Sequence, residues 1–532
     1  MAFPAHLSIV LHAHLPFIRH PEHAYHLEEM WFYEAMHETY LPLLQMLDRL
    51  EADDVSGAMT LSLSAPLLAM MGDYLLRERF ITHLDRLVSF CESEQGRVQG
   101  DAELEAVARY YQQRFVGLRE YFVDELNGDI IGAFRRHGTS DRLELMTCVG
   151  THPILPLMAT EEGKRAQVRV GLDHFEACFG HRPRGVWLAE CAFTPGVDRI
   201  LADEGIQFSF LEEVAITGAG AAPVFGTYSP VVSPAGVAFF GRDRFAAAQV
   251  WSAGEGYPGD PEYREFYRDR GYDLAKETLA PYFHPDGIRH DTGLKYHRIT
   301  GDVALDDKRF YRPERAAQRV GEHAAHFIRS RIEQVEVVAD SLGDRPAHLT
   351  CPYDAELFGH WWFEGTQFIE EVFRQAASTS ALNLSTPVDF LQTVDVVQQS
   401  TPATSTWGED SYFAVWLDES NAGIYRHLRN AEETMVELAD RFRDEASPRK
   451  RRALEQAARE LVLAQASDWP FIIKTATAVE YAQGRLREHL SNFEDLAQML
   501  VDADAMDEAF LSALEQRHNL FAELDAGHWQ SD

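Results

Sequence analysis

Short apolar runs that alternate with helical stretches constrain most strongly how this chain can fold. The first run is Leu7-Ser-Ile-Val-Leu11, whose β-branched and apolar residues fit a buried strand. Runs of the same kind return at 58–64, 143–149, 184–188, 208–211 and 348–351. Helical stretches such as 161–179 separate several of them. Strands that alternate with helices predict a parallel sheet or a βα barrel.

Two helical regions interrupt and extend this alternation. Residues 66–140 are almost wholly helical in pattern, and the pattern becomes helical again beyond about 400. We therefore predict a discontinuous catalytic domain over 1–65 and 141–400, and an inserted helical domain over 66–140. A C-terminal helical domain over 401–532 is expected to contribute to the active-site groove. The segment 217–300 is rich in Gly, Pro and aromatic residues, which predicts long loops, and long loops in a compact domain are often functional.

The charge balance narrows the classes of partner. The 532 residues carry 84 acids and 49 bases, for a net charge of −35. Such a surface repels phosphate backbones and anionic lipids, whereas neutral sugars are not repelled. The simplest reading is that the charge maintains solubility. We expect no nucleic-acid partner and no membrane partner.

The spacing of the cysteines and the N-terminal residues indicate an intracellular location. None of the five cysteines forms a CxxC pair, which is typical of a reduced, intracellular protein. The N-terminal residues lack a basic region followed by a long apolar one, and no apolar run approaches ~18–20 residues. The prediction is a cytoplasmic protein, as a monomer or a small homo-oligomer.

Two histidines stand at the exit of the first predicted strand. His12 and His14 are two residues apart and so point to the same side, at the rim where barrel active sites lie. They could ligate a metal, with His152 as a third ligand. They could hydrogen-bond a sugar and orient a carboxylate, or be satisfied structural histidines. The pattern favours the sugar-binding reading.

Two acids follow apolar runs in the same manner. Glu190 comes directly after Trp187-Leu-Ala, and Asp354 after Leu349-Thr-Cys-Pro-Tyr. Because a buried charge is costly unless paired, Glu190 is either catalytic or half of a salt bridge. Asp354 could be catalytic or could cap the start of a helix. Glycosidic-bond chemistry commonly uses two carboxyl groups that face each other across the substrate.

Aromatic residues near these acids are candidates for stacking on sugar rings. They include Trp407 and Trp416, although each alone is more often a core residue. Trp469 stands beside another acid, Asp468. The chain shows neither a phosphate-binding loop nor a nucleophile elbow. Strand-end acids, paired histidines and many tryptophans together favour carbohydrate chemistry.

These residues match known sequence motifs, and the chain resembles glycoside hydrolase family 57, within it the 1,4-α-glucan branching enzymes. The matching regions occur in the family's order: His12-Ala-His14-Leu-Pro16, Thr147-Cys-Val-Gly-Thr-His152, Trp187-Leu-Ala-Glu190, Tyr353-Asp354-Ala-Glu356 and Ala466-Ser-Asp-Trp-Pro-Phe471. The resemblance implies an α/β fold, an incomplete (β/α)7 barrel with an inserted helical domain and a C-terminal helical domain.

The resemblance also implies residue roles. Glu190 would be the nucleophile and Asp354 the general acid/base of a retaining double displacement. The substrate-binding residues would be His12, His14, His152, Trp251, Trp361, Trp407, Trp416, Asp468 and Trp469. A tyrosine on a loop within 217–260 would shield the site, with Tyr228 and Tyr257 as candidates. No metal and no organic cofactor is expected.

The implied activity is cleavage of an α-1,4-glucan and transfer of the segment to a 6-hydroxyl, which makes an α-1,6 branch in glycogen-type carbohydrate metabolism. An α-amylase or a 4-α-glucanotransferase of the same family is the nearest alternative. A metal-dependent barrel hydrolase that uses His12 and His14 is an alternative of another class. A non-catalytic glucan-binding protein is disfavoured because both acids are present.

Overall fold

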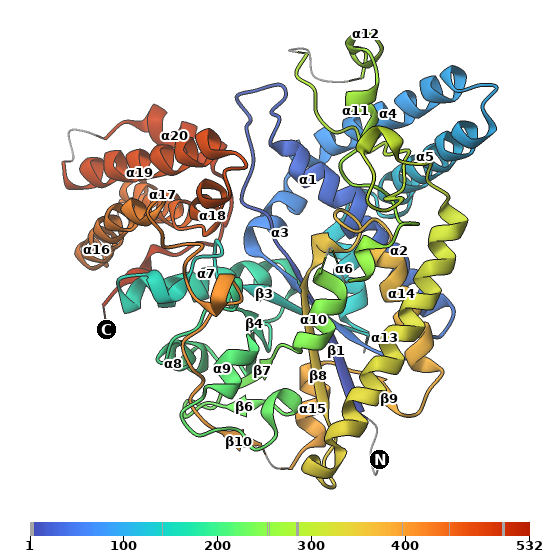
Figure 1. Ribbon diagram of the computed structural model, residues 1–532. Coiled ribbons are helices and arrows are strands. Elements are labelled where there is room, and N and C mark those ends of the chain that lie inside the picture. The colour runs from blue at the N-terminus through green and yellow to red at the C-terminus, as the bar shows by residue number, and fades with distance from the viewer. Residues whose placement is uncertain are drawn as a thin grey trace.

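A parallel sheet lies at the centre of the computed structural model, which describes residues 5–531 apart from 141, 253, 255, 283–286, 396, 446 and 503–505 (Figure 1). The predicted boundary at 141 and parts of the predicted loop segment fall outside this set. The strands run in the order β4-β3-β2-β1-β8, with all pairings parallel. They are β1 (Ala5–Ala13), β2 (Met59–Leu63), β3 (Leu143–Cys148), β4 (Val186–Trp187) and β8 (His348–Asp354). Each coincides with an apolar run of the sequence.

Two further strands extend the sheet into an incomplete barrel. β5 (Phe208–Leu211) pairs in parallel with β7 (Ala238–Gly241). Single parallel bridges join Gly185 to Phe208 and Arg242 to Thr350, so they link β4 to β5 and β7 to β8. Among the described residues, seven strands thus form a ring, in which two of the neighbouring strand pairs are joined by a single bridge each. The predicted incomplete (β/α)7 barrel is confirmed.

The segment 217–300 contains long loops, as predicted, together with short strands and helices that were not predicted. It contains β7 and its antiparallel neighbour β6 (Val231–Val232), which pairs with β10 (Gln398–Gln399). It also holds the helices α10 (Arg244–Trp251), α11 (Arg270–Asp273) and α12 (Lys276–Leu279). β7 is only four residues long and buried on both faces, so it shows no alternation that a sequence pattern could reveal.

Helices surround the sheet. They are α1 (Glu29–Ala35), α2 (Leu41–Ala52), α7 (Glu161–Phe179), α8 (Val197–Asp203), α9 (Glu213–Thr217), α13 (Pro313–Leu342), α14 (Gly365–Ala377) and α15 (Pro387–Thr393). α7 shows why such segments are helical: the Thr160 side chain caps its first turn, and Gly180 ends it at a φ of 80°. Strand β9 (Leu382–Leu384) pairs with the amino-terminal part of β1.

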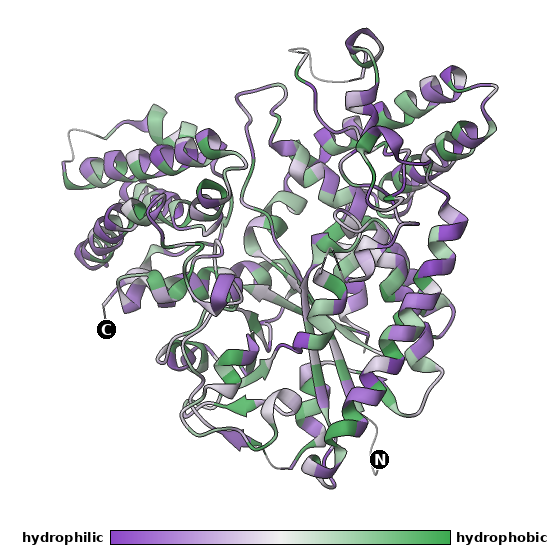
Figure 2. Cartoon of the chain, in the orientation of Figure 1, coloured by the Kyte–Doolittle hydropathy of each residue, from purple (hydrophilic) through white to green (hydrophobic). Residues whose placement is uncertain are grey.

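Helices also fill the two regions where the sequence predicts them. α3 (Ala65–Gly72), α4 (Tyr74–Arg97), α5 (Ala102–Glu120) and α6 (Ile130–Gly138) come first. α16 (Tyr425–Arg441), α17 (Pro448–Ala464), α18 (Asp468–Thr475), α19 (Val479–Val501) and α20 (Glu508–Arg517) come last. Figure 2 shows hydrophobic and hydrophilic residues alternating along them, as in amphipathic helices.

The apolar faces of both helical regions join a common core. Phe80 and Phe115 of the first region, and Leu461 and Phe493 of the second, belong to the same buried cluster as Leu7 and Leu349 of the barrel. Figure 1 places α4 and α5 and the helices α16–α20 on opposite sides of the carboxyl end of β1. None of the described helices combines the length and apolar character needed to span a bilayer. The carboxyl ends of β1 and β8 therefore lie where elements from both helical regions can reach them.

Candidate active site

Three histidines meet at the carboxyl end of β1. Nε2 of His12 lies 3.0 Å from Nε2 of His152, and the rings of His14 and His152 stack at 3.9 Å. Serine hydroxyls hold the other ring nitrogens, Ser62 at 3.2 Å from His12 and Ser467 at 2.9 Å from His152. The predicted proximity of these histidines is therefore present. The strand register also brings an acid to this edge of the sheet, since His12 pairs with Asp354 across β1 and β8.

The histidines differ in charge. Burial lowers the pKa of both His12 and His152 well below the usual value, so both rings are neutral at pH 7. Burial alone would also lower the pKa of His14, but the Asp468 carboxylate outweighs it and leaves that pKa raised. Nε2 of His14 lies 3.1 Å from the nearer Asp468 oxygen. The cluster thus combines two neutral rings with one ring that readily becomes a cation.

The same groups could ligate a metal. Ligand atoms of His14, His152 and Asp468 all lie within 4.8 Å of one another, as do those of His12, Cys148 and His152. In the structure, however, the ring nitrogens of His14 already contact Ser64 at 2.9 Å and Asp468. An ion would have to replace these hydrogen bonds.

Glu190 lies next to the histidine cluster in a strained backbone conformation. Its φ of 58° is in the left-handed region, which non-glycine residues seldom adopt and which is often associated with function. The indole N–H of Trp407 donates to Oε2 of Glu190 at 2.6 Å, and the backbone N–H of Trp407 donates to the Glu190 carbonyl at 2.9 Å. Nδ1 of His152 lies 3.9 Å from Oε1. These contacts fix the carboxyl group at the end of β4.

Asp354 is the last residue of β8. It precedes a short helical turn, but its side chain makes no capping hydrogen bond, so the helix-cap reading is wrong. The Arg242 guanidinium forms an ion pair with Glu212 at 3.0 Å and lies 5.4 Å from the Trp407 ring centroid. Its positive charge also favours the ionised form of Asp354. Arg242 therefore connects the surroundings of the two candidate catalytic acids.

Both acids bind protons more tightly than in water. Burial raises the pKa of Glu190 to about 8, and the nearby Asp354 charge raises it further, against the Trp407 N–H that lowers it. Burial raises the pKa of Asp354 to about 6, while Arg242 and His14 oppose the change. The pair therefore holds a single proton between these values. A site with one carboxylic acid and one carboxylate can act as acid and nucleophile.

A groove of about 600 Å³ extends from Asp354. Trp251 and Trp361 line it and are 41% and 55% exposed, so both rings have a face free for a ligand. Trp361 stacks on Phe266 at 4.6 Å, which fixes the plane of its ring. Aromatic faces of this kind suit the apolar face of a sugar.

Two tryptophans that were predicted to bind substrate are buried. Trp416 is 1% exposed and packs beside Gly408, and Trp469 is 1% exposed and donates its indole N–H to the Leu463 carbonyl. The expectations that Trp416 stacks on substrate and that Trp469 binds substrate do not agree with this burial. Their apolar rings fill the cores beneath the loop of Trp407 and beneath Asp468 instead.

The two candidate tyrosines of the predicted shielding loop face α13. The hydroxyl of Tyr228 accepts from Gln334 at 3.2 Å. Tyr257 is 8% exposed, and its hydroxyl lies 2.7 Å from Nδ1 of His326. Both hydroxyls are thus engaged by α13 in this structure.

The sequence motifs left three site residues without a role. Trp187 stacks on His12 at 4.7 Å and contacts Trp407 edge-on at 5.0 Å. Arg242 follows the unpredicted strand β7. Glu356 accepts hydrogen bonds from the Tyr40 hydroxyl and from the backbone N–H of His14, and burial raises its pKa to about 7. Trp187 and Glu356 stand within the sequence motifs, so the motifs could have identified them as site residues. Arg242 lies outside the motifs, and no sequence pattern marks it.

Known proteins resemble this chain along its whole length. The model of glycosyl hydrolase family 57 matches residues 8–403, and that of the 1,4-α-glucan branching enzyme C-terminal region matches residues 427–529. A 1,4-α-glucan branching enzyme of Thermococcus kodakarensis is 32% identical over 565 residues, which cover 99% of this chain and 79% of that protein.

Solved structures agree. The α-amylase AmyC of Thermotoga maritima is 36% identical with a TM-score of 0.94, and the match covers 100% of both chains. A family 57 branching enzyme of Pyrococcus horikoshii is 30% identical with a TM-score of 0.89, covering 100% of this chain and 97% of that one. The family match over residues 8–403 agrees with the strand-end acids, the histidine cluster and the incomplete barrel, and it shows that the chain belongs to glycoside hydrolase family 57.

Proposed function

We propose that the protein is a retaining α-glucan branching enzyme, which cleaves an α-1,4-glucan and transfers the released segment to a 6-hydroxyl. The observation that carries the proposal is the pair Glu190 and Asp354 at one site, from which an aromatic-lined groove extends on the Asp354 side. The similarity to branching enzymes over nearly the whole chain supports the choice of acceptor.

In this proposal Glu190 is the nucleophile. Its carboxylate attacks the anomeric carbon, while Asp354 donates its proton to the departing glycosidic oxygen. Without substrate, the shared proton is favoured on Glu190, which has the higher pKa. The positive charge that develops on the sugar stabilises the ionised form of Glu190 and so favours the proton on Asp354. The Trp407 N–H at 2.6 Å stabilises the same form. Asp354 then accepts a proton from the incoming hydroxyl, which completes the exchange with retention.

The histidine cluster positions the donor sugar. His12 and His152 are neutral and can each donate or accept a hydrogen bond, which suits neutral hydroxyl groups. His14 is held by Asp468 of α18, so the C-terminal helices complete the site. Trp407 would support the donor through Glu190, while Trp251 and Trp361 would bind the leaving segment and the acceptor chain in the groove.

The proposed substrate is a neutral α-1,4-glucan such as amylose or a maltooligosaccharide. We propose that the product is an intracellular storage glucan of the glycogen type, made in the cytoplasm by a monomer or small homo-oligomer. The acidic surface supports a neutral polymer as the partner, because it repels polyanions.

Hydrolysis is the second candidate function. Water rather than a sugar hydroxyl would then resolve the covalent intermediate, as in an α-amylase. Two observations favour this candidate: the 36% identity to an α-amylase, and the engagement of the Tyr228 and Tyr257 hydroxyls by α13 instead of by the catalytic acids. The two functions share all steps up to the intermediate, so only the product separates them.

The test is incubation of the purified protein with amylose. Branching predicts a loss of iodine absorbance and new α-1,6 signals in proton NMR spectra, with few new reducing ends. Reducing ends that rise in step with cleavage would establish an α-amylase instead. Redistribution of maltooligosaccharide lengths without α-1,6 linkages would establish a 4-α-glucanotransferase.

Two variants and a chelator complete the design. Glu190→Gln and Asp354→Asn should each lower transfer by at least about 10³-fold, as expected when a catalytic group is lost, with unchanged circular dichroism. Near-wild-type activity of either variant would contradict that residue's role. Loss of activity after exhaustive chelation, restored by a divalent metal, would favour the metal-dependent hydrolase that uses His12 and His14.

A further inference from the structure

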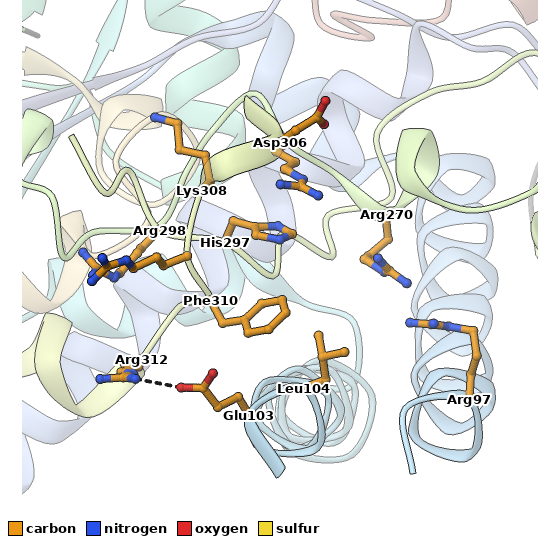
Figure 3. Close-up of a pocket in the computed structure, with 12 residues that line it drawn as sticks. Arg97, Glu103, Leu104, Arg270, His297, Arg298, Asp306, Lys308, Phe310 and Arg312 are labelled. Atoms are coloured by element: carbon orange, nitrogen blue, oxygen red, sulfur yellow. Dashed lines mark hydrogen bonds and ion pairs between the residues drawn. The ribbon is translucent and has the colours of Figure 1, made fainter. Parts of the chain in front are cut away.

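A second cavity, of about 490 Å³, lies where α4 and α5 meet the segment 297–312. Figure 3 shows the side chains of Arg97 and Arg270 converging on it from one side, and those of Arg298 and Arg312 lying on the other. Such a concentration of guanidinium groups is unexpected in a chain with a net charge of −35. The proposed catalytic residues do not explain it.

The cationic groups on one side of this basic pocket outnumber the acids that pair with them. Glu94 is shared by Arg97, at 2.6 Å, and Arg270, at 3.0 Å. Asp273 is shared by Arg270, at 3.3 Å, and Arg268, at 3.4 Å. Three guanidinium groups therefore compensate two carboxylates.

Arg309 adds a further positive charge to the lining. Within the part of the chain that the structure describes, no hydrogen bond or ion pair is found for its guanidinium. The remaining cations are paired one to one, for example Arg312 with Glu103 at 2.7 Å. Asp306 also lines the pocket and, among the described residues, forms no ion pair, so the excess is about one positive charge. This excess favours an anion such as a phosphate monoester, whose charge is about −1.5 to −2 at pH 7.

A buried histidine lies among these side chains. His297 is 4% exposed, and among the described residues its Nδ1 has no hydrogen-bond partner. Burial, followed by the charge of Arg268, lowers the pKa of His297 to about 4. A buried polar group without a partner is rare, and the ring belongs to a residue that lines the pocket. An anion would offset the positive field around the ring.

The lining also suits a sugar. Phe310 and Leu104 give the pocket an apolar surface, and Phe310 packs against His297 at 5.3 Å. Carboxylates of Glu103 and Asp306 lie at the same pocket and can accept hydrogen bonds from hydroxyl groups. Those carboxylates would repel a polyanion such as a nucleic acid. The volume is that of a small-molecule site.

This basic pocket shares a wall with the groove of Asp354. Lys308 lines both cavities, and its ammonium group donates to the Ile299 carbonyl at 2.6 Å and pairs with Glu265 at 2.8 Å. Arg298 and Arg309 face the basic pocket, whereas Ile299 and Leu305 of the same segment face the groove. A ligand that holds this segment would therefore act on one wall of the groove.

We propose that the basic pocket binds a small sugar phosphate, and that the bound ligand is an effector of the glucan groove. The phosphate contacts Arg309 and the guanidinium groups of Arg268 and Arg270, and the sugar hydroxyls contact Glu103, Asp306 and His297. The effector part rests on the proposed function, whereas the binding part does not.

Calorimetric titration of the full-length protein tests the binding. Glucose 6-phosphate, inorganic phosphate and glucose are the probes. We expect saturable binding of glucose 6-phosphate at one site and weaker binding of inorganic phosphate. Any binding of glucose should be the same in the wild type and in Arg309→Ala. Arg309→Ala should weaken glucose 6-phosphate binding by at least roughly tenfold, since a charge-assisted contact is lost.

Arg315→Ala is the matched control, because Arg315 is also exposed, stands six residues further along and does not line the pocket. Equal affinity of wild type and Arg309→Ala for glucose 6-phosphate, or no binding at all, would overturn the proposal. Inorganic phosphate that binds as tightly as glucose 6-phosphate would overturn the assignment of a sugar.

The effector part is tested in the Glu190→Gln background, where glucan binding can be measured without turnover. Saturating glucose 6-phosphate should change the affinity for maltoheptaose by about fivefold, a typical coupling between sites. Unchanged affinity would overturn the effector part alone. A failure of the branching assay in the wild-type protein would leave the calorimetric result unaffected, so the two proposals fail separately.

Discussion

At the scale of single residues, the carboxyl groups of Glu190 and Asp354 determine how activity depends on pH. With pKa values raised to about 8 and about 6, the pair carries one proton between these limits. Below the lower limit both groups are protonated and no nucleophile remains, and above the upper limit no acid remains. We expect a bell-shaped profile of kcat/KM with limbs near these two values, which belong to the pair as a whole.

The acid limb offers an internal control. Arg242 favours the ionised form of Asp354, so Arg242→Gln should move the acid limb to higher pH while the protein stays folded. An unchanged limb in this variant, or a profile without two limbs in the wild type, would contradict the electrostatic account of the pair.

Glu190 should also lower the stability of the folded protein at high pH. Its folded-state pKa of about 8 lies above the ordinary value of 4.5, so its contribution to stability is fully present below about 4.5 and is lost as pH rises through 8. Glu190→Gln does not ionise. The variant should therefore be more stable than the wild type by about 1–3 kcal/mol at pH 9, and the difference should shrink at pH 5.

Denaturant unfolding at the two pH values measures this difference. Glu433→Gln, on the exposed surface of α16, is the control and should show no comparable trend. A difference between wild type and Glu190→Gln that is independent of pH would show that Glu190 is not destabilised by burial.

The sequence predicts some residues of the site better than others. Glu190, Asp354 and the three histidines stand at the ends of apolar runs, so strand order alone brings them together. Trp416 and Trp469 have the same kind of neighbours, but burial depends on tertiary packing that a sequence motif does not report. Arg242 reaches the site through β7, a strand too short for any periodic pattern.

At the scale of elements, the turn after β8 depends on one glycine. Gly359 has a φ of 122°, and a Cβ there would overlap the carbonyl oxygen of Glu38. Its N–H donates to the Trp362 carbonyl at 2.8 Å, which closes the turn that carries Trp361. Gly359→Ala should lower the free energy of unfolding by about 2–4 kcal/mol, because it combines backbone strain with a steric clash.

Gly321 is the matched control on α13. A Cβ there would meet nothing within 4 Å, and the position is inside a regular helix. Gly321→Ala should therefore raise the stability by about 0.5–1 kcal/mol. Thermal unfolding of both variants gives the comparison, and equal effects of the same sign would contradict the structural distinction between the two glycines.

Element prediction succeeded where segments are long or strongly patterned. β1, β2, β3, β5 and the long helices coincide with the predicted runs, because buried strands and amphipathic helices leave clear patterns. It missed the short strands and helices within 217–300, which tertiary contacts with β5 and β8 impose although Gly and Pro are frequent there. The division into domains at 66–140 and 401–532 stays a prediction.

At the scale of the whole molecule, the net charge of −35 makes stability depend on salt. Like charges repel more in the compact state than in the unfolded chain, and dissolved ions screen that repulsion. The Tm at pH 8 should therefore rise by several degrees between about 0.01 M and 0.15 M NaCl. Scanning calorimetry near pH 5.0, the calculated isoelectric point, is the control and should show little salt effect. A Tm that falls or stays constant at pH 8 would contradict this expectation.

The contact between His14 and Asp468 has a consequence for how the protein is made. The two residues are 454 positions apart, and the second belongs to the C-terminal helices. A ribosome adds about 5–20 residues per second, so roughly 20–90 s separate the synthesis of the two partners. Throughout that interval β1 has its histidines in place, and Ser62 and Ser64 follow soon, but the carboxylate that pairs with His14 is still missing. The nascent chain therefore lacks this contact, and the site is completed only after α18 has left the ribosome.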